Sequence, residues 1–255
     1  MQPMNGISEL EQQQVALAQT RGADFRSDAI RRLVAERIKP GSVLDVGCGA
    51  GGLVAWLLDH GYDARGVDLS GPIVAAAQEN LRACGLDATR IREASVDTLV
   101  EQGDLADNIV NMDCLEHIED DHAAFAGLVS AVRPGGKLIV TVPAIPSLFG
   151  AKDRAVGHYR RYTPGRLKEL AARHPLRVDE LKYWNLLGVA PTFVAVRLFD
   201  RAVDESFRYG EAGAGKRTLR RGLSAWFRHV ENRIKPPLGL TLLMVATVLG
   251  DSGNE

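Results

Sequence analysis

The feature that most constrains this chain is a short apolar segment that leads directly into a cluster of glycines. Residues 43–46 place Asp45 among two valines and a leucine, and glycines follow at positions 47, 49, 51 and 52. The apolar residues predict a short buried strand, and the glycines predict a tight turn that opens the next helix. Glycine has no Cβ, so the backbone there can adopt a positive φ and approach a ligand, with the N–H groups of the helix start facing it. The segment therefore predicts a nucleotide-type site at the carboxyl edge of a parallel sheet.

The glycine spacing alone leaves more than one nucleotide open. Gly47, Gly49 and Gly52 satisfy the G-x-G-x-x-G pattern of dinucleotide sites, so NAD is an alternative at this point. A phosphate-binding P-loop is excluded, because the Gly-Lys-Ser/Thr ending is absent. No lysine or arginine lies between residues 43 and 58 to meet a pyrophosphate, and Asp45 would repel one. Asp45 suits instead a cationic or ammonium-bearing ligand.

A second acidic residue extends the predicted site. Residues 66–70 predict a second strand, and Asp68 follows the glycines at about the twenty-residue offset at which a carboxylate binds ribose hydroxyls. The alternative is that Asp68 caps the helix that begins near Pro72. Because the strand, the spacing and the residue type agree, we prefer the ribose role.

Four segments, in this order along the chain, resemble the motifs of the class I S-adenosylmethionine-dependent methyltransferases. Residues 43–52 resemble the glycine-rich motif, residues 66–70 the acidic ribose motif, and residues 108–118 and 132–143 the motifs of the fourth and fifth strands. The likeness covers about residues 31–182, and Leu-Glu-His-Ile at 115–118 is similar to the small-molecule branch that includes quinone-biosynthesis O-methyltransferases. The resemblance implies a Rossmann-like α/β fold, with a seven-stranded, mostly parallel sheet, helices on both faces, an antiparallel last strand and a helical cap.

The resemblance also implies where S-adenosylmethionine and its product S-adenosylhomocysteine bind. In one place the chain departs from many relatives: they carry an aspartate after the third strand that holds the adenine amine, and Ala94 stands there in this chain. The adenine contact therefore falls to Ser95 and Val96. No metal is expected. The predicted cofactor-binding residues are Asp45, Gly47, Cys48, Gly49, Gly51, Asp68, Leu69, Ser95, Val96, Asp113 and Cys114.

Two polar groups are candidates for the acceptor side. His117 follows the fourth strand and is the first candidate general base for a hydroxyl acceptor, against the alternative of a structural histidine at a helix start. Glu116 either orients cofactor or substrate or caps the following turn. A second group follows the fifth strand, and its arginines either bind a carboxylate or phosphate or pair structurally with Asp153 or Glu169. This group supplies His158 and Tyr159 as further catalytic candidates, and Arg160, Arg161 and Tyr162 as substrate-binding candidates.

The connection between residues 185 and 237 predicts an insertion, because it spans about fifty residues where connections usually run about four to six. Residues 186–203 and 216–235 predict two helices around a glycine break at 210–215. The second carries seven basic residues, and Glu231 is its one acidic residue. Its polar face is either solvated or directed at a membrane surface or an anionic substrate.

The chain divides into five predicted parts. Residues 7–20 predict a glutamine-rich helical lid or arm, and the resemblance implies that residues 240–248 form the seventh strand, paired with 178–184. The predicted parts are an amino-terminal arm at 1–38, a donor-binding core at 39–184, the insertion at 185–237, a last core strand at 238–250 and a tail at 251–255.

Composition narrows the class of partner and the compartment. A net charge of −1 gives no support for a nucleic-acid substrate, and the fourth strand lacks the Asn/Asp-Pro-Pro-Tyr ending of amino-directed nucleic-acid methyltransferases. Cys48, Cys84 and Cys114 show neither metal spacing nor an even disulfide framework, which fits a reducing cytoplasm. The longest apolar run, at residues 238–250, is shorter than the ~20 residues that a membrane span needs.

These features predict a cytoplasmic S-adenosylmethionine-dependent methyltransferase that acts on a small molecule. Oxygen is the first candidate for the acceptor atom, and nitrogen and carbon are the others. We expect a monomer or a homodimer. Two alternatives are a methyltransferase that acts on a lipid or quinone at a membrane surface and a non-catalytic protein that binds S-adenosylmethionine.

Overall fold

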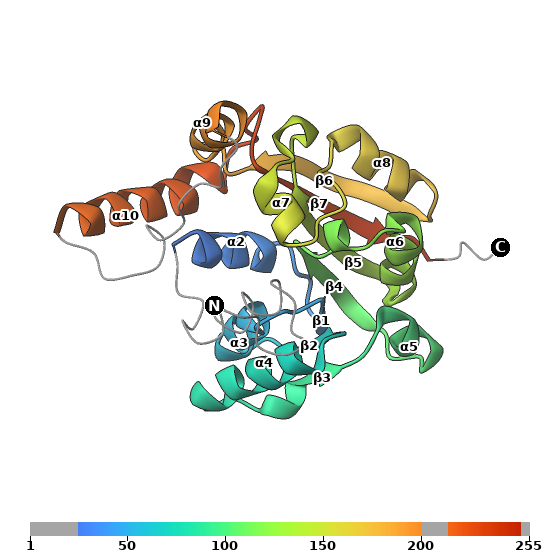
Figure 1. The fold of residues 1–255 in the computed structure, drawn as a ribbon. Helices are drawn as coiled ribbons and strands as arrows, with labels where there is room; N and C mark the ends of the chain where they lie inside the picture. The colour runs from blue at the N-terminus through green and yellow to red at the C-terminus, as the bar shows by residue number, and fades with distance from the viewer. Residues whose placement is uncertain (1–24, 200–213, 251–255) are drawn as a thin grey trace.

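The computed structural model describes residues 25–199 and 214–250. Its strands are β1 (Val43–Val46), β2 (Ala64–Asp68), β3 (Ile91–Glu93), β4 (Ala106–Met112), β5 (Val132–Pro143), β6 (Leu176–Trp184) and β7 (Thr241–Val248). They form one sheet in the order β3-β2-β1-β4-β5-β7-β6 (Figure 1). β1 to β5 pair in parallel, and β7 runs antiparallel to both β5 and β6. The predicted α/β fold, with a mostly parallel seven-stranded sheet and an antiparallel last strand, is confirmed.

Helices cover both faces of this sheet (Figure 1). The α-helices are α2 (Phe25–Ala35), α3 (Gly52–Asp59), α4 (Gly71–Ala83), α5 (Val96–Glu101), α6 (Asp121–Ser130), α7 (Ala151–Ala155), α8 (Pro164–Ala172), α9 (Val189–Phe199) and α10 (Ala214–Trp226). Shorter turns are η1 (Ala88–Arg90), η2 (Leu115–His117), η3 (Pro146–Leu148) and the π-helical η4 (Phe227–Glu231).

The central strands carry apolar residues toward both sides of the sheet because both of their faces are buried. Successive residues of a strand point to opposite faces. Ile109 of β4 therefore joins one core cluster with Phe125 of α6, while its neighbour Val110 joins the other with Leu33 of α2 and Leu57 of α3. Near-continuous apolar runs are expected for parallel strands that helices cover on both sides.

The predicted pairing of the last two strands is also confirmed. Trp184 of β6 lies opposite Thr241 of β7, and Tyr183 lies opposite Leu242. Seven of the eight residues of β7 are buried, which explains the late apolar run as a core strand. Among the described residues, no helix has the length and apolar character needed to cross a membrane.

Buried polar contacts anchor the insertion to the sheet and to α2. Lys182 of β6 donates from Nζ to the backbone oxygens of Glu231 and Asn232, at 3.2 Å in each case. The indole of Trp184 donates to Asn232 Oδ1 at 2.9 Å, and Asn232 Nδ2 donates to the oxygen of Ala29 at 2.9 Å. The η4 turn that follows α10 is thereby fixed, and α10 itself extends away from the sheet (Figure 1).

The two predicted insertion helices correspond to α9 and α10, with a π-helical turn after α10 where one continuous helix was expected. The predicted helix at residues 7–20, the predicted tail at 251–255 and the segment 200–213 lie outside the described residues.

Candidate functional site

The glycine turn lies between the carboxyl end of β1 and the start of α3. Gly47, Gly49 and Gly51 all have positive φ, at 72°, 52° and 72°. A Cβ on Gly47 would collide with Sγ of Cys114, and one on Gly51 would collide with the side chain of Ile91. Both positions therefore require glycine for space as well as for backbone conformation. The close approach of Gly47 to Cys114 also brings the ends of β1 and β4 together.

Asp68 links the glycine turn to the loop after β2. Its Oδ2 atom accepts a hydrogen bond from the Gly49 backbone N–H at 3.0 Å, and its Oδ1 atom accepts one from Ser70 N–H at 3.1 Å. Ser70 caps α4, because its hydroxyl accepts from Ile73 N–H at 3.4 Å. The alternative of Asp68 as the helix cap is therefore not what the structure shows. The neighbouring Leu69 is 71% exposed at the same edge, where it offers an apolar surface to a ligand.

Asp45 is a buried carboxyl group next to this turn. It is 3% exposed, and its Oδ1 atom has no hydrogen-bond partner among the described residues. Burial raises the pKa of Asp45 to about 7, the charge of Asp68 adds to the rise, and Arg31 opposes it. A buried, incompletely paired carboxyl group is costly unless a cation or donor faces it. This observation fits a ligand that carries an ammonium group.

Arg31 is a candidate site residue that our sequence analysis missed. It lies on α2, and its guanidinium reaches the glycine turn so closely that a Cβ on Gly52 would collide with Nη2. Its positive charge acts on Asp45. No motif in the sequence marks this arginine, because the contact depends on how α2 packs over α3.

The loops after β3 and β4 complete the edge. The Ser95 hydroxyl accepts from Thr98 N–H at 3.0 Å and caps α5, and the partly buried Val96 is the first residue of that helix. Asp113 has a φ of 47°, and its Oδ1 accepts from the Thr141 hydroxyl at 3.3 Å. Burial raises the pKa of the Cys114 thiol to about 12, so Cys114 stays protonated near pH 7.

Burial also raises the pKa of the Cys48 thiol, to well above its ordinary value. Cys48 is 8% exposed within the glycine turn. Both thiols therefore serve as packing groups rather than as nucleophiles.

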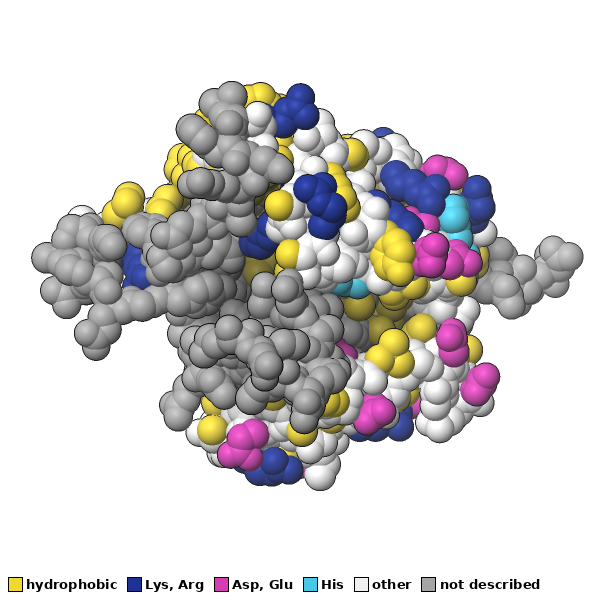
Figure 2. Space-filling model, in the orientation of Figure 1, with side chains coloured by type: hydrophobic (Ala, Val, Ile, Leu, Met, Phe, Trp, Pro, Cys, Tyr) yellow, Lys and Arg dark blue, Asp and Glu magenta, His cyan; other side chains and the backbone are white. Residues whose placement is uncertain are grey.

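Two histidines meet beside the end of β4. The rings of His117 and His158 lie edge to face, with centroids 4.5 Å apart and an interplanar angle of 83°. Burial, together with the charge of His158, lowers the pKa of His117 to about 4, so this imidazole is neutral near pH 7. His158 Nδ1 lies 2.9 Å from Asp153 Oδ1. Figure 2 shows apolar side chains around a hollow on the viewed face, with a histidine visible in it.

Glu116 lies next to this pair and is 1% exposed. Burial raises the pKa of its carboxyl group well above the usual range, and the charge of Asp113 contributes. Tyr159 donates its backbone N–H to the Glu116 backbone oxygen at 2.8 Å, whereas the Tyr159 side chain is 54% exposed. The structure thus brings His117, His158 and Glu116 together and leaves the Tyr159 ring at the surface.

The other predicted substrate contacts are engaged within the protein. Arg161 Nε lies 2.9 Å from Asp153 Oδ1, and Arg160 Nη1 lies 3.2 Å from Asp121 Oδ1. Tyr162 is fully buried and donates its hydroxyl to Asp121 Oδ2 at 3.2 Å. These contacts favour the structural alternative for the arginines, in which they order the loop that carries His158.

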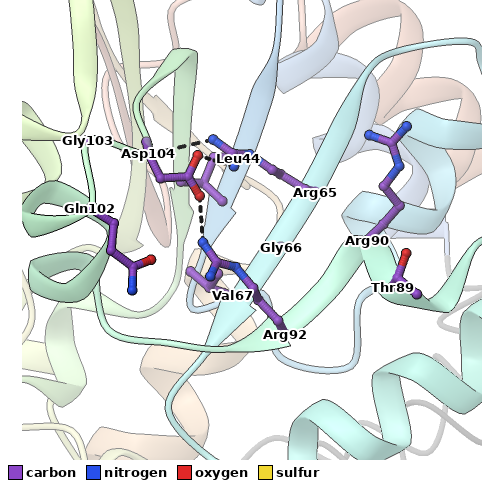
Figure 3. Close-up of a pocket in the computed structure, with 10 residues that line it drawn as sticks. All are labelled: Leu44, Arg65, Gly66, Val67, Thr89, Arg90, Arg92, Gln102, Gly103 and Asp104. Carbon is purple, nitrogen blue, oxygen red and sulfur yellow. Dashed lines mark hydrogen bonds and ion pairs between the residues drawn. The ribbon is translucent and has the colours of Figure 1, made fainter.

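A separate cavity of about 600 Å³ includes none of the residues above (Figure 3). It lies against β2, β3 and the segment before β4. Arg65 and Arg92 both point at Asp104 and pair with it, and Arg90 pairs with Asp63. Because these arginines are already paired with carboxylates, the cavity lacks the open charges and the glycine turn that the carboxyl edge provides.

Comparison with known proteins identifies the family of this chain. Residues 17–182 match the protein family described as methyltransferase domain. A ubiquinone biosynthesis O-methyltransferase from Xanthomonas axonopodis pv. citri is 31% identical over 134 residues, which are 51% of this chain and 56% of that protein. Phosphoethanolamine N-methyltransferase 2 from Caenorhabditis elegans is 34% identical over 108 residues, which are 41% of this chain and 24% of that protein. The chain thus spans about half of the length of the first of these curated relatives and about a quarter of the second.

Solved structures share the fold at low sequence identity. A chain from the complex between the Haloferax volcanii Trm112 methyltransferase activator and a methyltransferase aligns with a TM-score of 0.61 at 17% identity, covering 96% of this chain and 100% of that one. An S-adenosylmethionine-dependent methyltransferase from Mesorhizobium loti aligns with a TM-score of 0.56 at 17% identity, covering 89% and 99%. At 17% sequence identity, these two alignments show that the fold is similar and show nothing about activity.

Proposed function

The chain belongs to the methyltransferase domain family, and we propose that it transfers a methyl group from S-adenosylmethionine to a hydroxyl group of a small molecule. The observation that carries this proposal is the arrangement at one sheet edge of the glycine turn, Asp68 and Asp45. Curated relatives named as O-methyl- and N-methyltransferases support the reaction class, and the proposed oxygen acceptor follows the more numerous O-methyltransferases among them.

The residues at this edge suit each part of the donor. The turn at Gly47, Gly49 and Gly51 leaves space for close backbone approach, and the Asp68 carboxylate has lone pairs for ribose hydroxyls. Asp45 suits the ammonium group of the methionine portion, and Arg31 suits its carboxylate, since a guanidinium binds carboxylates with two parallel hydrogen bonds. Leu69, Ser95 and Val96 follow β2 and β3 on the side proposed for adenine.

When bound, S-adenosylmethionine supplies a sulfonium methyl group, whose bond to sulfur breaks with its electron pair going to sulfur as the bond to the acceptor oxygen forms. The protein has to align the acceptor behind that methyl group and to receive the hydroxyl proton. We assign the proton to the His117 imidazole, which is neutral near pH 7 and lies at the end of β4. His158 lies beside it, and Asp153 fixes the orientation of the His158 ring.

Replacing Arg31 by alanine tests the methionine end of the proposed site. We expect the affinity for S-adenosylhomocysteine to fall about 10- to 100-fold, because a charge-assisted pair is lost. The affinity for 5′-methylthioadenosine, which lacks the amino-acid portion, is expected to stay within about threefold. Isothermal titration of both ligands against the wild-type protein and the variant measures the difference.

Arg32→Ala is the matched control. Arg32 is the next residue of α2, but it pairs with Asp28 at 3.1 Å and lies over the ring of Trp56. The Arg32→Ala variant should bind S-adenosylhomocysteine and 5′-methylthioadenosine with the affinities of the wild-type protein. An equal loss of both ligands in Arg31→Ala would mean that Arg31 only supports the packing of α2, and would contradict the assignment.

One observation favours a second candidate, a methyltransferase that works at an anionic membrane surface. α10 extends from the body (Figure 1), and on this helix Leu219 is 54% exposed and Arg221 is also exposed. Phe193 of α9 is 51% exposed. A basic amphipathic helix with exposed apolar residues suits the headgroup region of a bilayer.

Vesicle flotation tests this second candidate. The membrane-surface function predicts that the protein floats with vesicles that contain anionic lipid and that Arg221→Glu reduces the floating fraction. Arg173→Glu, at the residue that follows α8, should leave it unchanged. Absence of flotation with anionic vesicles would remove the membrane-surface function and leave the acceptor as a freely diffusing molecule.

A further inference from the structure

The carboxyl group of Glu116 is buried without a hydrogen-bond partner. It lies in η2, directly after the end of β4, and is 1% exposed. Neither Oε1 nor Oε2 has a hydrogen-bond partner among the described residues. Buried polar atoms are almost always paired, and an unpaired one calls for an explanation such as an unseen ion. The proposed methyl transfer does not use this carboxyl group.

His158 faces the same carboxyl group with its ring nitrogen Nε2. Nε2 lies 3.8 Å from Glu116 Oε1, which is too long for a hydrogen bond. On the other side of the ring, Nδ1 lies 2.9 Å from Asp153 Oδ1, and that carboxylate can only accept. In the neutral form of the ring, Nδ1 therefore carries the proton and Nε2 carries the lone pair. A histidine held by a carboxylate in this way is the usual outer partner arrangement of a metal ligand.

His117 supplies a third ligand atom from an independent direction. Its ring stands edge to face with that of His158, and one ligand atom from each of Glu116, His117 and His158 lies within 4.8 Å of the other two. Ligands at 2.0–2.2 Å from a tetrahedral ion lie roughly 3.3–3.6 Å apart. Small side-chain movements are sufficient to close the three atoms around one ion.

We propose that Glu116, His117 and His158 form a binding site for one divalent transition-metal ion of the Zn²⁺ class. Two imidazoles and one carboxylate favour such ions over Mg²⁺ and Ca²⁺, which prefer oxygen ligands. The positive charge of the ion would compensate the negative charge of the buried Glu116 carboxylate. The carboxylate would bind the ion through one or both of its unpaired oxygens. Three protein ligands leave a coordination position open, as in catalytic rather than structural zinc sites.

The open position gives the site a role in the reaction, and this part rests on the proposed function. A hydroxyl group bound to a divalent ion loses its proton to solvent water more readily, so the ion would replace the His117 imidazole as the group that activates the acceptor. Acceptors with a hydroxyl next to a second oxygen would then be preferred, because the second oxygen can also bind the ion. In either case the His117 side chain is required.

Metal binding is tested without donor or acceptor, so its outcome is separate from that of the proposed function. Chelator-treated protein is titrated with Zn²⁺ alone in a calorimeter, and with Co²⁺ while the visible spectrum is recorded. We expect one ion per chain and the intense visible bands of four- or five-coordinate Co²⁺ with nitrogen and oxygen ligands. Glu116→Gln and His158→Ala should each weaken Zn²⁺ binding at least about 100-fold, on the order of the loss of one ligand of three.

His229→Ala, an exposed histidine in η4, is the control and should bind Zn²⁺ as the wild-type protein does. Circular dichroism establishes whether each variant is folded. If Glu116→Gln does not fold, the Co²⁺ spectrum of the wild-type protein tests whether nitrogen and oxygen ligands bind the ion. Absence of stoichiometric binding, retention of binding in His158→Ala, or a thiolate-to-Co²⁺ charge-transfer band from Cys48 or Cys114 would overturn the proposal.

Discussion

Replacing Asp68 by alanine is expected to weaken binding of S-adenosylhomocysteine at least about 100-fold, which corresponds to about 2.7 kcal/mol. Two effects add. The carboxylate that we propose for the ribose hydroxyls is lost, and hydrogen bonds to charged groups contribute about 1.5–3 kcal/mol each. The Gly49 and Ser70 N–H groups also lose their acceptor, so the glycine turn and the loop after β2 are no longer joined. Isothermal titration of the purified variant measures the affinity.

Asp87→Ala is the matched control for Asp68→Ala. Asp87 also accepts from a backbone N–H two residues later, that of Thr89 at 2.9 Å, but in an exposed turn before η1. We expect its affinity for S-adenosylhomocysteine to equal that of the wild-type protein. An unchanged dissociation constant in Asp68→Ala would contradict the ribose role, even if other parts of the site bind the ligand.

The second large effect is expected for His117→Ala. Turnover should fall about 10²- to 10⁴-fold, the range for loss of a positioned general base, while the affinity for S-adenosylhomocysteine stays within about threefold. The affinity is retained because the imidazole lies beside the end of β4, away from the glycine turn and Asp68. Turnover is measured with a panel of phenols and catechols as acceptors. A coupled assay monitors the release of S-adenosylhomocysteine.

His122→Ala serves as the control, since His122 lies on α6 and has no part in the histidine pair. It should keep wild-type turnover. If His117→Ala turned over as fast as the wild-type protein with the same acceptor, the acceptor's proton would have to leave by another route. A wild-type protein that binds the donor but methylates no acceptor of any class would support the non-catalytic alternative.

The proposed donor side of the site is predictable from the sequence because its determinants are local in sequence. A glycine with positive φ, a short buried strand and an aspartate about twenty residues later each constrain the backbone near them. Gly47 and Asp68 therefore indicate a donor site from the sequence alone, and the structure adds that Asp68 links the glycine turn to the loop after β2. The antiparallel β7 was predictable from a buried apolar run together with the family resemblance.

The acceptor side was less predictable because it depends on contacts between distant residues. His158 lies 41 residues after His117, and only the packing of the loop after β5 on η2 brings their rings together. The same packing decides that Arg160 and Arg161 pair with Asp121 and Asp153 within the protein. Arg31 reaches Gly52 through the position of α2 on α3, which no spacing within α2 encodes. Residue types limited the candidates, and tertiary packing selected among them.

The most direct test of the central claim is a paired titration of the wild-type protein with S-adenosylhomocysteine and with NAD. The account predicts one molecule of S-adenosylhomocysteine per chain with a dissociation constant on the order of micromolar, and no binding of NAD. Binding of NAD, or failure of S-adenosylhomocysteine to bind folded protein, would contradict the assignment of the glycine turn, Asp68 and Asp45 to a methyl donor.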